Sequence, residues 1–561
     1  MFIPTTKEEM KSRHWQQLDV ILVTGDTYID SPFIGVTIIG KVLIEAGYRV
    51  GIIAQPDIHD SNDICRLGTP RLFWGVTAGS VDSMVANYTA LKKRRKKDDY
   101  TPGGINNRRP DRASIVYANL IKKYSKGKKP IVLGGIEASL RRIAHYDYWD
   151  NRIRRSILFD AKADLLVYGM AERTIVEIAN HYNDKKGFES VRGVCYISKK
   201  PRKGYLLLPS FSDVCADPGK FIDMFHLFYR NNDPIQSHGL CQQQDTRYLI
   251  QNPPPIPLSQ NELDAIFDLE YERSVHPFYQ SSGEVRAIRT IKFAVTSHRG
   301  CFGECHFCAI HMHQGREIQN RSVKSILKEV RHLTQEDDFK GYIMDIGGPT
   351  ANMYELGCGL PLKKRSCRNR QCLFPATCPH LCVDHEKQIQ LLRKIRQVKG
   401  VKKAFVASGL RYDLIMADQK NGRNYLRELT RHHISGQLKI APEHVEKKVL
   451  LLMGKGSQYD VAQFKHCFYT INQAEHKKQF LTYYFMAAHP GCSEKDMKFL
   501  QRYIKKNLHL KPEQVQIFTP TPSTYSSLMY YTGIDPFSGQ SVFVEKNNKR
   551  KEKQKKLIIN S

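Results

Sequence analysis

Short apolar runs that alternate with helical patterns are the feature that most limits what this chain can fold into. In the first third, such runs occur at residues 19–23, 50–54, 130–133 and 163–167, with helical periodicity after several of them. This alternation is typical of parallel sheets, whose strands need a helical crossover to return to the same edge. We therefore expect a Rossmann-like, doubly wound α/β domain, in which ligands bind beyond the carboxyl ends of the strands.

The same alternation resumes near residue 293. A strand is predicted at 293–297, and five more strand patterns follow, most of them leading into a helical pattern: residues 342–346, 403–407, 437–440, 479–485 and 515–518. Six such units predict a partial (β/α)6 barrel. In α/β barrels the chemistry takes place at the carboxyl ends of the strands.

These patterns predict the domain organisation. The Rossmann-like domain covers residues 1–195, and an extended connector with weak periodicity and a run of prolines covers 196–285. The barrel covers residues 286–535 and carries a cysteine-rich insert at 355–386. Residues 536–561 are strongly basic, and we expect them to form a tail without fixed structure.

The chain shows no apolar run long enough to cross a bilayer and no secretory signal at its N-terminus. We therefore expect a cytoplasmic location without membrane contact, where cysteines stay reduced and free to bind metal. Eight of the fourteen cysteines lie between Cys301 and Cys382, so any metal chemistry is concentrated there.

The formal net charge is +30. A strongly basic protein attracts polyanions, which makes nucleic acid a candidate partner. Charge spread over a solvated surface is the plainer interpretation, and charge alone identifies no partner.

Three cysteines directly after the strand at 293–297 carry the clearest chemical signal. Cys301, Cys305 and Cys308 have the spacing C-x-x-x-C-x-x-C in a loop that contains glycine. Three thiolates so spaced can hold three irons of a four-iron cluster and leave the fourth iron without a protein ligand. A zinc site is the alternative, with His306, His311 or His313 as the fourth ligand.

A second group of cysteines lies in the insert, beside His380 and His385: Cys358, Cys367, Cys372, Cys378 and Cys382. A long loop without regular structure needs a reason to be ordered, and a bound metal supplies one. We predict a second metal site here. The spacing does not decide between structural zinc and an auxiliary iron–sulfur cluster.

The three-cysteine loop resembles the motif of the radical S-adenosylmethionine (SAM) superfamily. The resemblance implies a 4Fe–4S cluster that passes an electron to SAM, and hence an enzyme and an electron donor such as flavodoxin or ferredoxin. It also implies SAM contacts for Phe307, for the turn at Gly347 and Gly348, and for Arg411, whose planar fork suits a carboxylate.

The first domain resembles the cobalamin-binding domains that precede many radical SAM barrels. Those domains usually carry an Asp-x-His-x-x-Gly signature whose histidine ligates cobalt. This chain has Asp26-Thr27-Tyr28-Ile29-Asp30 at the corresponding place, without histidine. We therefore expect cobalamin to be an unlikely cofactor here.

Longer strings, including residues 134–142, 347–354 and 439–444, resemble the YgiQ-type radical SAM family over nearly the whole chain. That family supplies no substrate to carry over, so the substrate and the catalytic residues stay unknown. Three hypotheses follow: a radical SAM enzyme acting on an unknown substrate, an RNA-modifying radical SAM enzyme, or a non-catalytic protein that binds metal or nucleic acid.

Overall fold

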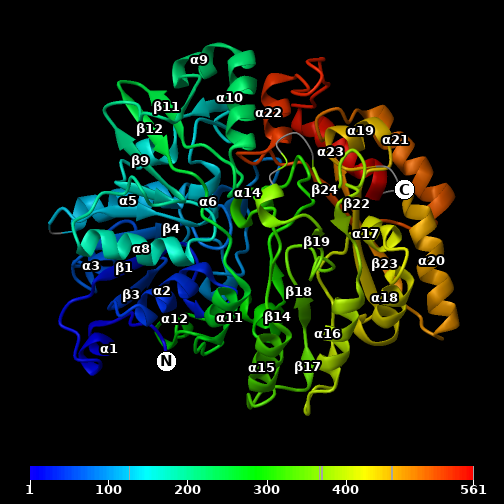
Figure 1. Ribbon diagram of the computed structural model, residues 1–561, viewed down its shortest axis with the longest axis horizontal. Helices are drawn as coiled ribbons and strands as arrows, with labels where there is room; N and C mark the ends of the chain where they lie inside the picture. Colours follow the sequence, from blue (N-terminus) through cyan, green and yellow to red (C-terminus); the bar gives the residue numbers. More distant parts are fainter. Residues whose placement is uncertain (126, 366, 368–370, 457–458, 560–561) are drawn as a thin grey trace. The chain divides into compact units, whose positions relative to one another are not determined.

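The apolar runs of the first third form strands in one half of a nine-stranded sheet, up to the edge strand β3 (Figure 1). In this computed structural model, which describes residues 1–125, 127–365, 367, 371–456 and 459–559, the strand order is β10-β11-β12-β9-β8-β5-β4-β1-β3. Five neighbouring strands are parallel: β1 (Val20–Thr24), β3 (Val50–Ala54), β4 (Phe73–Thr77), β5 (Ile131–Leu133) and β8 (Leu165–Val167). These strands are almost entirely buried, as expected for parallel strands covered on both faces.

The described chain divides into two units. Unit 1 comprises Met1–Ile256 and Leu269–Lys292 and contains this sheet, while unit 2 comprises Pro257–Asp268 and Phe293–Ser561. In unit 1, helix α2 (Gly35–Glu45) contacts β1 and β3 and packs on α8 (Glu172–Asn183), and α5 (Ala113–Tyr124) contacts β4. The α/β fold class is confirmed.

The segment expected to be an extended connector instead contains regular helices and strands, and three of its strands join the sheet. It contributes β10 (Leu206–Leu208), β11 (Leu240–Gln244) and β12 (Arg247–Gln251), and β9 (Val194–Ser198) joins them to β8. Helices α9 (Phe211–Ala216) and α10 (Pro218–Arg230) also come from it.

Strand β11 was not predicted from the hydropathy pattern because two of its buried side chains are glutamines. The side-chain oxygen Oε1 of Gln242 accepts from the Ala144 amide over 3.1 Å, and Oε1 of Gln244 accepts from the Ser156 amide over 3.0 Å. Paired in this way, a glutamine can be buried without a large cost.

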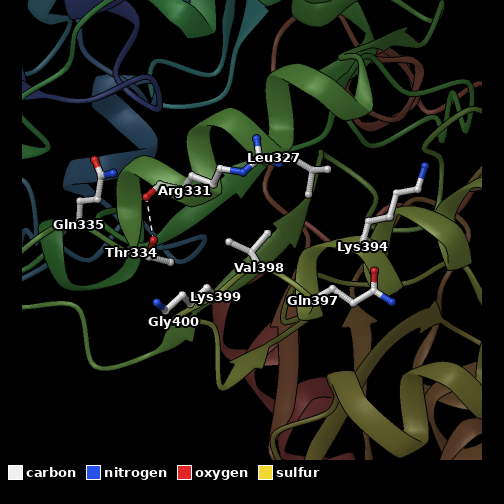
Figure 2. A pocket seen from close by; sticks show the side chains of 9 residues that line it. All are labelled: Leu327, Arg331, Thr334, Gln335, Lys394, Gln397, Val398, Lys399 and Gly400. Atoms are coloured by element: carbon white, nitrogen blue, oxygen red, sulfur yellow. Dashed lines mark hydrogen bonds between the residues drawn. The ribbon is translucent and has the colours of Figure 1, made fainter.

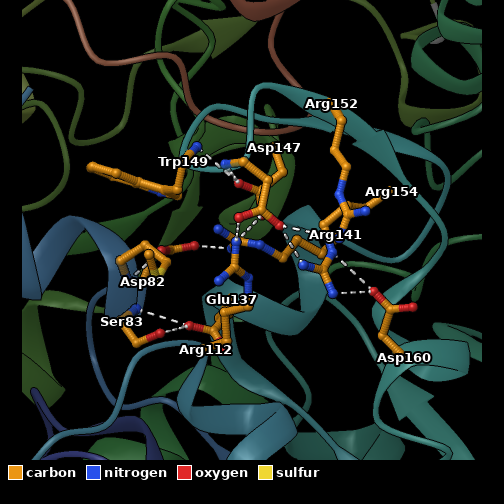
Figure 3. A network of polar contacts seen from close by, with 12 residues as sticks. Asp82, Ser83, Arg112, Glu137, Arg141, Asp147, Trp149, Arg152, Arg154 and Asp160 are labelled. Carbon is orange, nitrogen blue, oxygen red and sulfur yellow. Dashed lines mark hydrogen bonds and ion pairs between the residues drawn. The ribbon is translucent and has the colours of Figure 1, made fainter. Parts of the chain in front are cut away.

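A polar network supports the loops of unit 1 (Figure 3). Arg141 is buried and pairs with Asp82, while Arg112 binds Asp147 over 3.1 Å and Arg154 binds Asp160 over 2.7 Å. Glu137, in helix α6 (Gly135–Leu140), accepts from the amides of Ser83 and Ser114 over 2.9 and 3.1 Å. Each buried guanidinium of this network therefore has a carboxylate partner, which indicates a structural role.

Unit 2 contains strands at all six predicted places. They are β14 (Ala294–Thr296), β17 (Tyr342–Ile343) with β18 (Asp345–Gly347), β21 (Lys403–Ala404), β22 (Gln437–Glu443), β23 (Phe480–Ala487) and β24 (Gln514–Ile517). The pairs β14–β18, β17–β21, β22–β23 and β23–β24 are all parallel, and a parallel bridge between Leu410 and Ile440 links the segment after β21 to β22. Neighbouring strands thus follow one another in chain order.

The basic C-terminal segment differs from the expected tail without structure. Residues Asn548–Ile559 form helix α23, which buries Lys551, Gln554 and Ile558. The Ala488 amide donates to Gln554 Oε1 over 2.9 Å, and Lys551 Nζ donates to Tyr530 Oη over 2.8 Å. The helix was not predicted because its many lysines give no apolar pattern, although the buried residues recur at every third or fourth position.

Among the described residues, no helix is both long enough and apolar enough to span a bilayer.

Candidate active site

The three-cysteine loop, residues 301–308, lies between two short strands of unit 2. Strand β15 (His298–Arg299) pairs with β16 (Gln319–Asn320), and the loop projects from the end of β15. The Cys301 amide donates to the Gly315 carbonyl over 3.1 Å, and the Cys308 amide donates to the Cys305 carbonyl over 2.9 Å. Gly300 has φ +89°, and a Cβ there would lie 2.1 Å from the Glu317 carbonyl oxygen, so the entry to the loop requires glycine.

The three thiols lie close enough together to act on one another. Burial raises the pKa of the Cys308 thiol strongly, and the charges of Cys305 and Cys301 raise it further. Burial also raises the pKa of the Cys301 thiol, and the charge of Cys305 raises it further. Thiolates at Cys301 and Cys308 are therefore costly here without a cationic group to bind, which is the environment expected of a metal or cluster site.

No three His, Cys, Asp or Glu side chains within the described ranges converge on a point where one metal ion could sit. A single zinc ion needs such convergence. A four-iron cluster does not, because each cysteine binds a different iron. The loop provides three separate thiols, the number that would leave one iron of a four-iron cluster without a protein ligand.

Arg411 joins the cysteine loop from the end of the third predicted strand. Its Nη1 donates to Cys305 Sγ over 3.4 Å, and its Nε donates to Asp413 over 3.0 Å. Gly303 makes this approach possible, since a Cβ there would lie 2.9 Å from Arg411 Nη1 and 3.2 Å from Cys301 Sγ. The guanidinium predicted to bind SAM is thus shared between a carboxylate and a cysteine sulfur.

The glycine turn after β18 lies against the same loop. A Cβ on Gly348 would lie 2.6 Å from the His298 ring and from its carbonyl oxygen, so only glycine fits. Two residues on, Thr350 Oγ1 lies 3.5 Å from Cys301 Sγ, and the Thr350 carbonyl lies 3.0 Å from His298 Nε2. Sequence reasoning missed Thr350, although its place directly after Gly-Gly-Pro could have drawn attention to it.

Phe307 extends from the loop toward the end of β23. Its ring makes an edge contact with His489 at a centroid distance of 6.3 Å, and His489 Nε2 lies 2.6 Å from Ser526 Oγ. The segments after β14, β18, β21 and β23 therefore bring their predicted site residues to one end of the unit 2 strands.

Glu443, at the end of β22, adds a carboxylate to this end. Burial raises its pKa, although Lys455 and Arg411 act in the opposite direction, and its charge in turn raises the pKa of Cys308. Its backbone has φ +66°, which is uncommon for glutamate and typical of functional positions. No hydrogen bond to its carboxylate occurs within the described part of the chain.

A groove of about 650 Å³ lies elsewhere in unit 2 (Figure 2). It is lined by the ends of helices α15 (Val323–Leu333) and α16 (Glu386–Arg396) and by the residues after them, including Thr334 and Val398–Gly400. These segments lead into the amino ends of the strands, which in α/β barrels serve stability rather than chemistry. The groove is therefore not the candidate active site.

All five cysteines of the insert are free thiols. Cys358 lies in β19 (Gly357–Cys358) and Cys382 in β20 (Leu381–Cys382), which pair with each other. The Cys378 amide donates to the Cys372 carbonyl over 2.8 Å, and the Cys367 carbonyl accepts from Arg316 over 3.4 Å. Two pairs of the insert's cysteines are thus neighbours through the backbone, and none of its described residues forms a site for a single ion.

The chain is similar to proteins of known family. Residues 2–294 match the family model described as Radical SAM N-terminal. A UPF0313 protein of Fusobacterium nucleatum is 55% identical over 558 residues, covering 99% of this chain and 98% of the relative. A UPF0313 protein of Thermotoga petrophila is 50% identical over 562 residues, covering 100% of this chain and 98% of the relative.

Among solved structures, the fold is similar to that of the radical SAM methyltransferase TsrM from Kitasatospora setae. The form with cobalamin and a [4Fe–4S] cluster bound aligns at TM-score 0.52 and 12% identity, covering 91% of this chain and 77% of that one. The form with tryptophan substrate and the SAM analogue aza-SAM aligns at TM-score 0.50 and 12% identity, covering 90% and 74%.

The TsrM comparison corrects the expectation about cobalamin. That expectation rested on a missing histidine in the first domain, yet a protein with cobalamin bound shares the fold of this chain. The statement that cobalamin is unlikely was wrong, because a missing motif in one loop does not outweigh a shared architecture.

Proposed function

Because this chain belongs to the UPF0313 family of radical SAM proteins, we propose that it is an enzyme that binds a 4Fe–4S cluster through Cys301, Cys305 and Cys308. When bound, this cluster supplies the electron that cleaves SAM into methionine and a 5′-deoxyadenosyl radical, which takes a hydrogen atom from the substrate. We further propose that the strands of unit 2 form the partial (β/α)6 barrel that carries this site.

The observation that carries the proposal is the contact between Arg411 and the cysteine loop. Arg411 directs a guanidinium N–H at Cys305 Sγ over 3.4 Å, and such a charged donor suits a deprotonated sulfur as acceptor. Thr350 adds a hydroxyl beside Cys301. The loop is therefore built to hold deprotonated sulfur, which is the form that binds iron.

Other residues at this end are suited to position the ligand. Gly347 and Gly348 bring backbone close to the loop, and Phe307 offers an aromatic face. The Glu443 carboxylate suits a hydroxyl or ammonium group. Its raised pKa keeps it closer to the protonated form than an exposed glutamate.

The test is the formation of 5′-deoxyadenosine from SAM by the full chain, reconstituted anaerobically and reduced with dithionite. Wild type should form it, and a variant with Cys301, Cys305 and Cys308 all replaced by alanine should not. Equal product from both proteins, or none from an iron-loaded wild type, would contradict the proposal.

A cobalamin-dependent reaction is a second candidate, favoured by the fold match to TsrM over both units. Titration of the protein with hydroxocobalamin, followed by absorbance and gel filtration, tests it. Co-elution of about one cobalamin per chain supports this candidate, and complete separation of the two removes it.

An RNA substrate is the alternative that the net charge of +30 supports. Binding of RNA through phosphate contacts weakens as salt rises, with a log–log slope of about −0.7 per phosphate for single strands. An affinity for RNA that does not change with salt, or no binding at low salt, would count against this substrate.

A further inference from the structure

The register of the short antiparallel pair β19–β20 separates two of the five cysteines of the insert. In the β19–β20 pair, Cys358 lies opposite Leu381, and Cys382 lies opposite Gly357. Residues opposite each other in an antiparallel strand pair share a face, and successive residues along a strand point to opposite faces. Cys358 and Cys382 therefore lie on different faces, with Cys358 on the face of Leu381.

The face of Leu381 is the buried one. Leu381 and Cys378 belong to a hydrophobic core that also contains Leu373 and Phe302, and Cys372 packs against its edge. Phe302 belongs to the three-cysteine loop, and Cys301 packs against the same core. The insert is thus folded onto the loop that holds the proposed first cluster.

The remaining contacts place Cys367 in the same group. Burial raises the pKa of the Cys367 thiol, Arg316 lowers it, and Cys358 and Cys378 raise it. Cys378 likewise acts on Cys372, whose pKa is raised mainly by burial. Cys367 therefore lies within electrostatic reach of Cys358 and Cys378, and Cys372 within reach of Cys378. Arg316 donates to the Cys367 carbonyl and Gln371 donates to the Glu304 carbonyl, each over 3.4 Å, so the segments of Cys367 and Cys372 both lie beside the three-cysteine loop.

Cys382 is more exposed to solvent than these four cysteines. Its side chain is exposed, and its sulfur lies against Gly359, where a Cβ would be only 2.9 Å away.

We propose that Cys358, Cys367, Cys372 and Cys378 bind a second 4Fe–4S cluster, and that Cys382 is not a ligand. Four cysteines complete the coordination of such a cluster, in contrast to the three of the first loop. Each thiol gives its proton to solvent as its sulfur binds iron. Four cysteine thiolates would also suit one zinc ion, and analysis of the bound metal distinguishes the two.

Metal analysis of the full chain, reconstituted anaerobically with ferrous iron and sulfide, tests the proposal. Wild type should hold about eight iron atoms and the variant without Cys301, Cys305 and Cys308 about four, since the second site does not depend on the first. A wild-type content of about four, all lost in that variant, overturns the second cluster and leaves the first intact. One tightly bound zinc per chain in place of the extra iron overturns it as well.

Single replacements then test which cysteines are ligands. In the variant without the first site, Cys372→Ala should lose at least half of the remaining iron, while the matched control Cys382→Ala should lose none. Equal loss in the two variants contradicts the selection. To separate a lost ligand from a lost fold, Cys372→Ala is also made in wild type. There the SAM-dependent change in the electron paramagnetic resonance signal of the first cluster should persist, and its disappearance counts against a separate second site.

Discussion

Arg411 donates from Nη1 to the sulfur of Cys305 over 3.4 Å while its Nε binds Asp413 over 3.0 Å. The arginine therefore links a carboxylate to a cysteine that we propose as an iron ligand. Both partners act on the same planar group, so the position of the guanidinium relative to the sulfur is fixed.

Arg411→Lys should weaken the enzyme without unfolding it. A lysine keeps the charge beside Asp413 but cannot reach both partners with a rigid fork. We expect 5′-deoxyadenosine formation to fall about 10–100-fold, the usual range for the loss of a group that orients a metal ligand. The reduction potential of the cluster should also fall, because a hydrogen bond to sulfur stabilises the reduced, more negative form. The control is Arg423→Lys, at an exposed position. An unchanged potential in Arg411→Lys would contradict the role of this contact.

Gly303→Ala should impair cluster binding. The new methyl group would lie 2.9 Å from Arg411 Nη1 and 3.2 Å from Cys301 Sγ, so the arginine, the cysteine or the loop must move. We expect about a tenfold or greater loss of iron affinity, measured by competition with a chelator. Gly409→Ala is the matched control, because a Cβ there meets no atom within 4 Å. Similar iron affinity in both variants would refute this account.

Gln554→Ala should destabilise unit 2. The side-chain oxygen Oε1 of Gln554 accepts from the buried Ala488 amide over 2.9 Å. Removal of this side chain leaves that amide without its hydrogen bond. The free energy of unfolding should decrease by about 1–3 kcal/mol, measured by urea denaturation. Lys549→Ala, at an exposed position of the same helix, should change it by less than about 0.5 kcal/mol. A stable Gln554→Ala variant would show that α23 contributes little to the fold.

Glu428 should contribute stability that depends on pH. Burial raises the pKa of its carboxyl, but hydrogen bonds from His433 and Arg393 and the charge of Arg396 lower it to about 2. A folded-state pKa below the unfolded value stabilises the protein above the unfolded pKa of about 4.3, and this contribution is lost as pH falls toward 2.

We therefore expect Glu428→Gln to reduce the free energy of unfolding by about 1–3 kcal/mol at pH 7, with the difference from wild type shrinking below about pH 4.3. Urea denaturation between pH 7 and pH 3 measures this, with the exposed Glu513→Gln as control. A difference that grows as pH falls would have the wrong sign.

Much of the architecture could be predicted because it depends on local patterns. Buried parallel strands such as β1 and β3 are unbroken apolar runs, so they are visible without any knowledge of their partners. Strand β11 could not be predicted, because its glutamines are buried only through backbone partners about 90 residues away. Helix α23 was missed for a similar reason, since Gln554 and Ala488 are 66 residues apart.

The sequence by itself determined the α/β class and placed Cys301, Cys305 and Cys308 in one loop, because strand patterns and thiol spacing are set by neighbouring residues. Only the tertiary structure brought Arg411 to Cys305 across 106 positions and placed Cys358 and Cys382 on different faces of one strand pair. Contacts of this kind depend on strand register and on packing between distant segments. A shift of one residue in register would reverse which side chains share a face, and no local pattern records that choice.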